Sequence, residues 1–194
     1  MINVREGLPN AIPPIAGAVG DGIVNDTVAV ANIIAYLSTS PDTSDRGWTI
    51  FFPSGTYLLD KVVLPSDFCL VGDAAENTTL LRSSVAHDSN FIESKEYHLD
   101  QESDRLGTRG IGLCRLTIDG SKQLEPADAF HHEIAIYGVG IQLRGLIVSC
   151  SDVTDAGPFE RYFDSDRARW RPDHHNATVC PYINGWYAMF RKIA

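Results

Sequence analysis

Apolar and polar residues first alternate with a helical period, over residues 26–37 of the 194-residue chain. Gly20, Asp21 and Gly22 supply a turn before this segment. Three polar residues at its start can each place an oxygen over a helix N-terminus: Asn25, Asp26 and Thr27. Apolar residues then recur at spacings of three and four, at Val30, Ile33, Ile34 and Leu37. The pattern predicts one short amphipathic helix.

After a polar loop over residues 38–47, the pattern changes to short strands divided by Gly, Pro, Asp and Ser. Apolar strand segments centre near residues 51, 70, 91, 117 and 147. Gaps of roughly 20 to 30 residues between strand centres are typical of stacked coils in a solenoid, in which each strand buries its face on the next coil. The pattern therefore predicts a strand array with one helix at its head. A surface helix on an ordinary α/β domain is the alternative.

Alternation within the strands assigns faces, because successive side chains of a strand point to opposite sides. The inward positions are expected to be Phe68, Leu70, Leu116, Ile118, Leu146, Val148 and Cys150. Val71 and Ile147 are then expected on the outer face. If these two line up across coils, they would form an apolar stripe for contact between subunits.

Several stretches, in this order, resemble the opening of the pectate-lyase-like proteins with a right-handed parallel β-helix: GAVGDGIVNDT, FFPSGTYLL, VVLPSDFCLVG and LTIDG. That group includes polysaccharide lyases, relatives of family 28 glycoside hydrolases and phage tailspikes. The likeness covers roughly residues 10–157. It implies an all-β fold: a short, right-handed parallel β-helix of about five coils, with an N-terminal capping α-helix that covers the first coil. Tailspike relatives are commonly trimers, which implies a homo-oligomer packed side by side, with a trimer favoured.

Two regions at the ends of the chain do not follow the coil pattern. Residues 1–16 contain Pro9, Pro13 and Pro14, and X-Pro steps favour an extended arm, either packed on a neighbouring subunit or loose. Residues 158–194 are rich in aromatic and basic residues and show no coil repeat. We therefore expect one unit over residues 1–157, with arm, cap helix and β-helix. Residues 158–194 then form an irregular segment that covers the open C-terminal end or docks on another chain.

Charge and composition limit the partners. The net charge is −9, although residues 158–194 hold six basic and four acidic residues, so the acidic surplus lies in the body of the chain. An acidic body disfavours nucleic acid. Neither a membrane span nor a standard signal peptide is visible, which fits a virion or extracellular surface reached by another route. The four cysteines show no CxxC pair and are expected as reduced, partly buried thiols.

Candidate chemistry is weak throughout the sequence. Asp152 and Asp155 could form a carboxylate pair on one loop, although acids three residues apart are common on surfaces and the hydrolase-type triplets of the family are absent. His131 and Glu133 could share a site because they lie two residues apart on a strand, which makes them candidates for carbohydrate binding rather than for a metal. Asp119 matches a family position at a turn and is expected to be structural. No metal site and no cofactor are predicted.

Aromatic residues of the C-terminal segment suit either sugar stacking or a protein interface. Trp170 and Trp186 are candidates for carbohydrate binding, and Tyr162, Tyr182 and Tyr187 join Val71 and Ile147 as candidates for an interface. The charged insertion over residues 95–110 is either a wall of a glycan groove or a solvated loop.

Two functions remain open at this point. The first is a carbohydrate-recognising module of a tailspike or fibre in a phage-like particle, which attaches to cell-surface polysaccharide and contacts other virion proteins. The second is a polysaccharide lyase or glycoside hydrolase with an active site between subunits.

Overall fold

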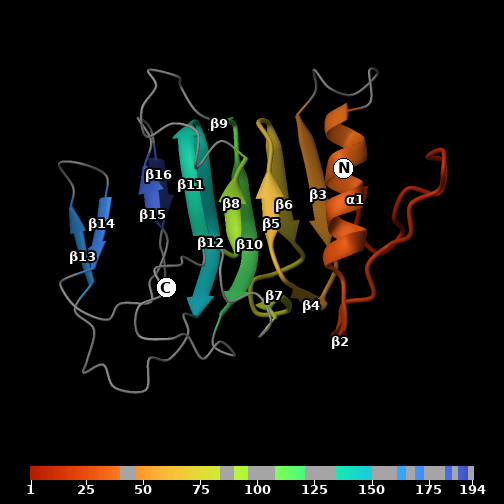
Figure 1. Cartoon of the computed structure of the whole chain (residues 1–194). Coiled ribbons are helices and arrows are strands. Elements are labelled where there is room, and N and C mark those ends of the chain that lie inside the picture. Colours follow the sequence, from red (N-terminus) through yellow and green to blue (C-terminus); the bar gives the residue numbers. More distant parts are fainter. Residues whose placement is uncertain are drawn as a thin grey trace.

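The chain forms a parallel β-helix closed at one end by a helix (Figure 1). The computed structural model describes residues 1–39, 47–83, 90–95, 108–120 and 134–149, and the strand segments 161–164, 169–172, 182–184 and 188–191. Among these residues every strand pairing between coils is parallel, and the only antiparallel ladder joins β13 (Arg161–Asp164) to β14 (Arg169–Pro172). This confirms the prediction of a short parallel β-helix with an N-terminal helical cap.

The main sheet is a ladder of rungs that stack in chain order. These are β1 (Ile2–Asn3), β3 (Trp48–Phe52), β6 (Phe68–Gly72), β10 (Gly112–Asp119), β12 (Ile141–Ser149) and β16 (Ala188–Arg191). A second run continues the same sheet beyond the corner of each coil: β2 (Asp21–Asn25), β4 (Gly55–Leu59) and β7 (Thr78–Arg82). β10 belongs to both runs, because its first half pairs with β6 and its second half with β7.

A second sheet forms another face of the solenoid. Its strands are β5 (Val62–Leu64), β8 (Ile92–Ser94), β11 (Ile134–Val139) and β15 (Tyr182–Asn184), with β9 (Thr108–Arg109) against the end of β11. The spacing along the chain suggested that the apolar segment near residue 91 is a rung like the others, but it is not part of the main sheet. It belongs to β8, which lies on a different face from β6 and β10.

The core is a column of inward side chains that repeats from rung to rung. Ile50, Leu70, Leu113 and Leu143 occupy one register of the main sheet, and all are buried. The predicted inward positions Phe68, Leu70, Leu116, Ile118 and Leu146 are confirmed as buried. Val148 is partly buried against the same core, and Cys150 lies outside the described residues.

Helix α1 (Thr27–Thr39) covers the first coil with the face that its periodicity predicts. Its buried residues are Val30, Ile33, Ile34 and Leu37. The Asn25 Oδ1 atom accepts a hydrogen bond from the Thr27 N–H at 2.9 Å, which caps the helix. Asp26 acts differently: its carboxylate turns back and accepts hydrogen bonds from the N–H groups of Val19 (2.7 Å) and Gly20 (3.0 Å). Asn25 thus caps the helix, whereas Asp26 joins the helix to the preceding turn.

The start of the N-terminal arm is not loose, because it packs on its own chain. Packing of the arm on a neighbouring subunit stays a prediction. β1 pairs with β3, and Val4 is fully buried. The Arg5 guanidinium donates from Nη2 to the carbonyl oxygens of Gly20 (3.2 Å) and Ser54 (2.9 Å), and it lies 5.6 Å from the centre of the Tyr57 ring. The arm is the first rung of the stack.

Part of the C-terminal region continues the sheets. β15 pairs in parallel with β11, and β16 pairs in parallel with β12, although the sequence showed no further repeat there. These two segments cover the backbone edge of the preceding coil. The boundary predicted at residue 157 lies outside the described residues, so the division into 1–157 and 158–194 stays a prediction.

Candidate functional site

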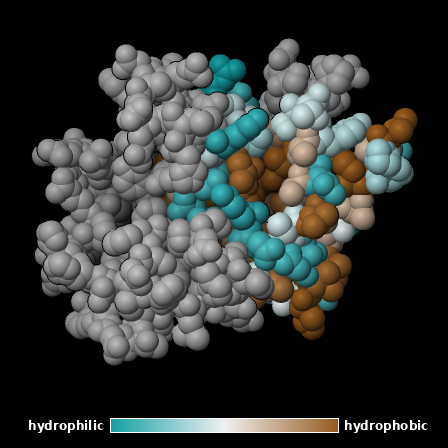
Figure 2. All heavy atoms as spheres, in the orientation of Figure 1, coloured by the Kyte–Doolittle hydropathy of each residue, from teal (hydrophilic) through white to brown (hydrophobic). Residues whose placement is uncertain are grey.

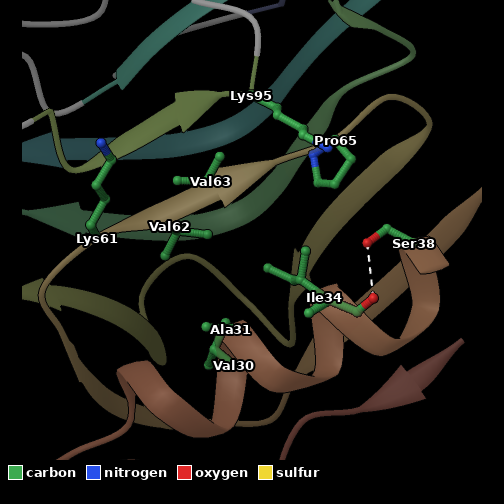
Figure 3. A pocket seen from close by; sticks show the side chains of 10 residues that line it. Val30, Ala31, Ile34, Ser38, Lys61, Val62, Val63, Pro65 and Lys95 are labelled. Carbon is green, nitrogen blue, oxygen red and sulfur yellow. Dashed lines mark hydrogen bonds between the residues drawn. The ribbon is translucent and has the colours of Figure 1, made fainter.

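A pocket of about 320 Å³ lies between α1 and β5, at the capped end of the solenoid (Figure 3). Its walls are apolar side chains from the helix and from the strand, including Val30, Ile34, Val62 and Val63. Two lysines stand at its rim: Lys61 before β5, and Lys95, whose side chain extends toward Pro65. The pocket combines an apolar interior with two cationic groups at its mouth.

The Lys61 ammonium is already paired. Its Nζ atom lies 2.6 Å from Oε1 of Glu93, a β8 residue that is only 5% exposed, and the Asn90 Nδ2 atom donates to Oε2 of the same carboxylate at 3.2 Å. A buried carboxylate requires such partners, because an unpaired charge in the interior is costly. The pair therefore holds the start of β5 against β8. Because Lys61 is paired and the walls are apolar, the pocket offers few hydrogen-bonding groups to a hydroxyl-rich sugar.

The outer face of the main sheet is more polar, and its positions repeat at the spacing of the rungs. Thr79 on β7 and Thr117 on β10 are neighbours in register, and both are half-buried. The Thr117 hydroxyl donates to the Ala75 carbonyl at 2.7 Å. On β12, Gln142 and Arg144 are exposed on the same face. This surface offers hydrogen-bond donors and acceptors on neighbouring parallel strands, which lie about 4.8 Å apart.

One edge of this face is fixed by polar contacts between coils. Asp67 has a positive φ of 64°, and its carboxylate lies 3.3 Å from Nε of Arg109 on the next coil. The Ser66 hydroxyl oxygen accepts a hydrogen bond from the Arg109 N–H at 3.1 Å. Both Asp67 and Arg109 keep substantial exposure, so the contact stabilises the turn modestly and stays open to solvent.

Val71 and Ile147 are both half-buried outer positions, as predicted, but they do not stand on one ladder. Val71 lies between Phe51 and Cys114, whereas Ile147 lies beside Thr117. The expected stripe through both residues is therefore not formed. An apolar stripe does exist on the outer face, and it consists of Phe51 and Val71.

Most of the other predicted site residues lie outside the described residues: Asp152, Asp155, His131, Glu133, Trp186 and Tyr187. Trp170, Tyr162 and Tyr182 fall on the backbone of β14, β13 and β15, and their side chains are not described. Asp119 is the last residue of β10, which agrees with its expected place at a strand end. The structure thus neither joins nor separates the predicted catalytic and carbohydrate-binding groups.

The fold brings together a pair of cysteines that no sequence pattern indicated. Cys69 on β6 and Cys114 on β10 are both free and half-buried, which agrees with the predicted reduced state. Their thiols hydrogen-bond to each other, and this contact lowers the pKa of Cys114 to about 6 and raises that of Cys69. Only the register between β6 and β10 could have revealed the pair.

A family model described as rhamnogalacturonase A/epimerase, pectate lyase-like, matches residues 16–136, which is more than half of the chain. The chain belongs to this family. The match includes the cap helix and the rungs from β3 to β10, which carry the core column described above. The predicted resemblance to pectate-lyase-like proteins is therefore confirmed.

One curated relative of this pectate lyase-like chain is the SPbeta prophage-derived uncharacterized protein YomE of Bacillus subtilis (strain 168). The two are 25% identical over 170 residues, which covers 75% of the present chain and 26% of the relative. The chain thus spans about a quarter of the length of that relative. The match relates the chain to a protein of prophage origin.

The chain is similar to two solved structures. The A-module of the mannuronan C-5 epimerase AlgE6 of Azotobacter vinelandii superposes with a TM-score of 0.53 at 18% identity, over 76% of this chain and 37% of the other. ORF18 of Geobacillus virus E2 superposes with a TM-score of 0.48 at 23% identity, over 78% of this chain and 29% of the other. The first of these supports the fold assignment alone.

Among the described residues, no cluster of three or more His, Cys, Asp or Glu side chains could hold a metal ion. No helix in that part of the chain is long and apolar enough to cross a membrane.

Proposed function

We propose that this pectate lyase-like chain is a carbohydrate-recognising module of a phage or phage-like particle, and that it attaches the particle to cell-surface polysaccharide. The observation that carries the proposal is the combination of a pectate lyase-like fold with a prophage-derived relative over three quarters of the chain. The acidic net charge favours neutral glycans, because a polyanion would be repelled.

The sugar-binding surface is proposed to be polar and aromatic rather than the apolar pocket beside α1. Exposed donors on β12, such as Gln142 and Arg144, can hydrogen-bond to hydroxyl groups. Trp170 and Trp186 offer rings on which the C–H faces of a sugar can stack, and His131 and Glu133 are further candidates. Other virion proteins and further copies of the chain are the proposed protein partners.

Binding of fluorescently labelled protein to bacterial cells tests this function. Cells of candidate hosts are compared before and after periodate treatment, which cleaves the vicinal diols of surface glycans. We expect binding that periodate removes and that a soluble polysaccharide of the same cells competes away. Binding that is unchanged by periodate, together with no binding on a glycan array, would rule out carbohydrate recognition.

Two variants then identify the binding groups. Trp170→Ala and Trp186→Ala are each expected to weaken binding about 5- to 30-fold, because loss of one stacking contact costs roughly 1–2 kcal/mol. The matched controls Trp170→Phe and Trp186→Phe keep an aromatic face and should retain most of the affinity. Equal losses in the Ala and Phe variants would argue against stacking.

A polysaccharide-degrading enzyme is the second candidate, favoured by the rhamnogalacturonase and the pectate lyase that the family description names. Incubation with polysaccharides, followed by assays of reducing ends and of absorbance from unsaturated products, distinguishes it from a binding module. Turnover that Asp152→Asn or Asp155→Asn abolishes would establish the enzyme and replace the first proposal.

A further inference from the structure

The second sheet of the solenoid begins at a strand that lacks a strand neighbour on one side. In the main sheet β1 precedes β3 and β2 precedes β4, so each run of that sheet has a further strand at the capped end. In the second sheet β5 is the end strand, and among the described residues it pairs only with β8. The element on its other side is α1 (Figure 3). The backbone groups of a helix bond to each other, so α1 does not complete the sheet.

Val63 is the residue whose backbone meets this open edge. Val62 donates its N–H to the Phe91 carbonyl oxygen at 2.7 Å. The Leu64 carbonyl oxygen accepts the N–H of Lys95 at 2.9 Å, so both neighbours of Val63 bond toward β8. Because alternate residues of a strand direct their backbone groups to opposite sides, the N–H and C=O groups of Val63 point away from β8, toward α1. The edge therefore presents one hydrogen-bond donor and one acceptor that no strand in the described part of the chain pairs with.

The pocket beside α1 provides room for a side chain next to this edge. Its volume is about 320 Å³, and its apolar floor includes the buried residues Ile34 and Val62. On the helix side it is bordered by the exposed residues Ala31 and Ala35, whose small side chains keep it open. Val63 itself lines the pocket. An extended chain that pairs with Val63 can therefore place an aliphatic side chain over this floor.

Lys95 places a positive charge at one end of the edge. Its N–H bonds to Leu64, the last residue of β5, so Lys95 stands beside the end of the strand. Lys95 is exposed, and its ammonium group has no ion-pair partner within the described part of the chain. Lys61, at the other end, is already paired with Glu93. The edge is therefore suited to one acidic residue, next to Lys95.

We propose that the pocket and the free edge of β5 together bind an extended segment of another protein. The segment adds a strand beside β5, inserts an aliphatic side chain into the pocket and places an acidic residue next to Lys95. An acyl chain fits less well, because it would cover the N–H and C=O groups of Val63 without replacing their hydrogen bonds to water. The site is separate from the proposed sugar-binding surface, and its test needs no glycan.

A short peptide, acetyl-Ser-Thr-Ile-Asp-Thr-Ser-amide, is the probe, titrated into the isotope-labelled full chain and followed by amide NMR spectra. The acidic residue follows the aliphatic one because Lys95 lies at the C-terminal end of β5 and the strand pairings between coils are parallel. We expect a saturable shift of the Val63 amide signal with a dissociation constant of about 1 mM or below, and slower exchange of that amide hydrogen with solvent. The same peptide, N-methylated at its Ile and Asp residues, cannot donate to the Val63 carbonyl oxygen and should bind at least about tenfold more weakly.

Variants of the chain separate the three contacts. Val63→Pro removes the N–H donor but no bond to β8, and should weaken binding at least about fivefold, whereas Val63→Thr keeps the donor and should bind as the parent does. Ala35→Leu fills the pocket and should abolish binding, and Asn32→Leu, on an exposed residue of the same helix outside the pocket, is its control. Lys95→Gln should weaken binding about threefold. Urea denaturation verifies that each variant is folded.

Three results would overturn the proposal. No binding at a peptide concentration of about 2 mM would mean that Lys95 and Pro65 only protect the edge against pairing. Equal binding of the N-methylated peptide would exclude strand addition. Tighter binding of decanoate than of the peptide, with the same loss in Ala35→Leu, would assign the pocket to an acyl chain.

Discussion

At the scale of single residues, the corner within β10 and within β12 is made by backbone conformation rather than by a loop. In the β10–β12 ladder Cys114 pairs with Arg144 and Leu116 with Leu146, so Arg115 and Gly145 occupy the same corner. Arg115 has a φ of 55° and Gly145 a φ of 58°. These two coils turn with one residue in the left-handed region, where a side chain is unfavourable.

The shared corner predicts different responses to substitution at its two positions. Gly145→Ala should lower the free energy of unfolding by about 1–2 kcal/mol, because alanine is strained at this φ although its Cβ would make only ordinary contacts with Arg115, at 3.8 Å or more. Arg115→Gly should be close to neutral, since relief of strain offsets the greater entropy of the unfolded chain. Urea denaturation followed by circular dichroism measures both. Gly47→Ala, at an exposed glycine without a positive φ, is the control and should change stability by less than about 0.5 kcal/mol.

Asp26 links the turn to the cap helix, and its removal should be costly. The carboxylate is 2% exposed and accepts the N–H groups of Val19 and Gly20. Asp26→Ala leaves these donors without their acceptor, so we expect a loss of about 2–3 kcal/mol in the free energy of unfolding. Glu76→Gln, on an exposed side chain, is the control for loss of a carboxylate. Equal stability of the two variants in urea would show that the buried contact is not needed.

At the scale of elements, periodicity predicted the helix and the strand faces because these depend on neighbours along the chain. The buried positions of α1 follow its spacing of three and four residues, and Phe68 and Leu70 follow strict alternation on β6. The segment near residue 91 was counted with the strand centres of the other coils although it lies in the second sheet, since spacing along the chain does not say at which corner the chain turns. Arg115 gave no signal either, because arginine is not typical of a left-handed position.

Contacts that depend on register could not be predicted from the sequence. Cys69 and Cys114 are separated by a long stretch of chain, and their meeting requires that Cys69 face Gly112. The alignment of Val71 with Phe51, rather than with Ile147, has the same origin. The sequence thus indicated which residue types could belong to the candidate site. Which residues lie next to each other on adjacent rungs is known only from the structure.

The cap helix should contribute to stability through one face only. Ile33 lies on the inner face of α1 and is fully buried, whereas Val28 on the same helix is 69% exposed. Ile33→Ala should lower the free energy of unfolding by about 2–5 kcal/mol, because it leaves a cavity over the first coil. Val28→Ala is the matched control and should change it by less than about 0.5 kcal/mol. A comparable loss in both variants would contradict a contribution through one face only, because both substitutions raise helix propensity.

At the scale of the whole molecule, the stack must protect two ends and its outer face. α1 and the N-terminal arm cover the first coil, yet several large apolar side chains remain exposed at this end, where Figure 2 shows brown and teal surface side by side. They are Met1, Ile12, Ile23, Val24 and Val28. Because the first coil is already covered, these residues are part of the surface of the cap rather than an open core.

The outer face of the main sheet predicts that the chain assembles with copies of itself. The stripe of Phe51 and Val71 gives the outer face an apolar strip for side-by-side packing. We expect a homo-oligomer, with a trimer favoured, to which Tyr162, Tyr182 and Tyr187 also contribute. Light scattering at micromolar concentration should report a mass above the monomer value of 21.3 kDa.

Val71→Lys tests whether this stripe forms the contact. A lysine there would bury a charge in each interface, so the dissociation constant should rise at least tenfold, which corresponds to about 1.4 kcal/mol. Val63→Lys, on β5 and outside the main sheet, is the matched control and should leave the mass unchanged. A monomeric parent protein would contradict side-by-side packing, and an oligomer that Val71→Lys leaves intact would move the interface away from the stripe.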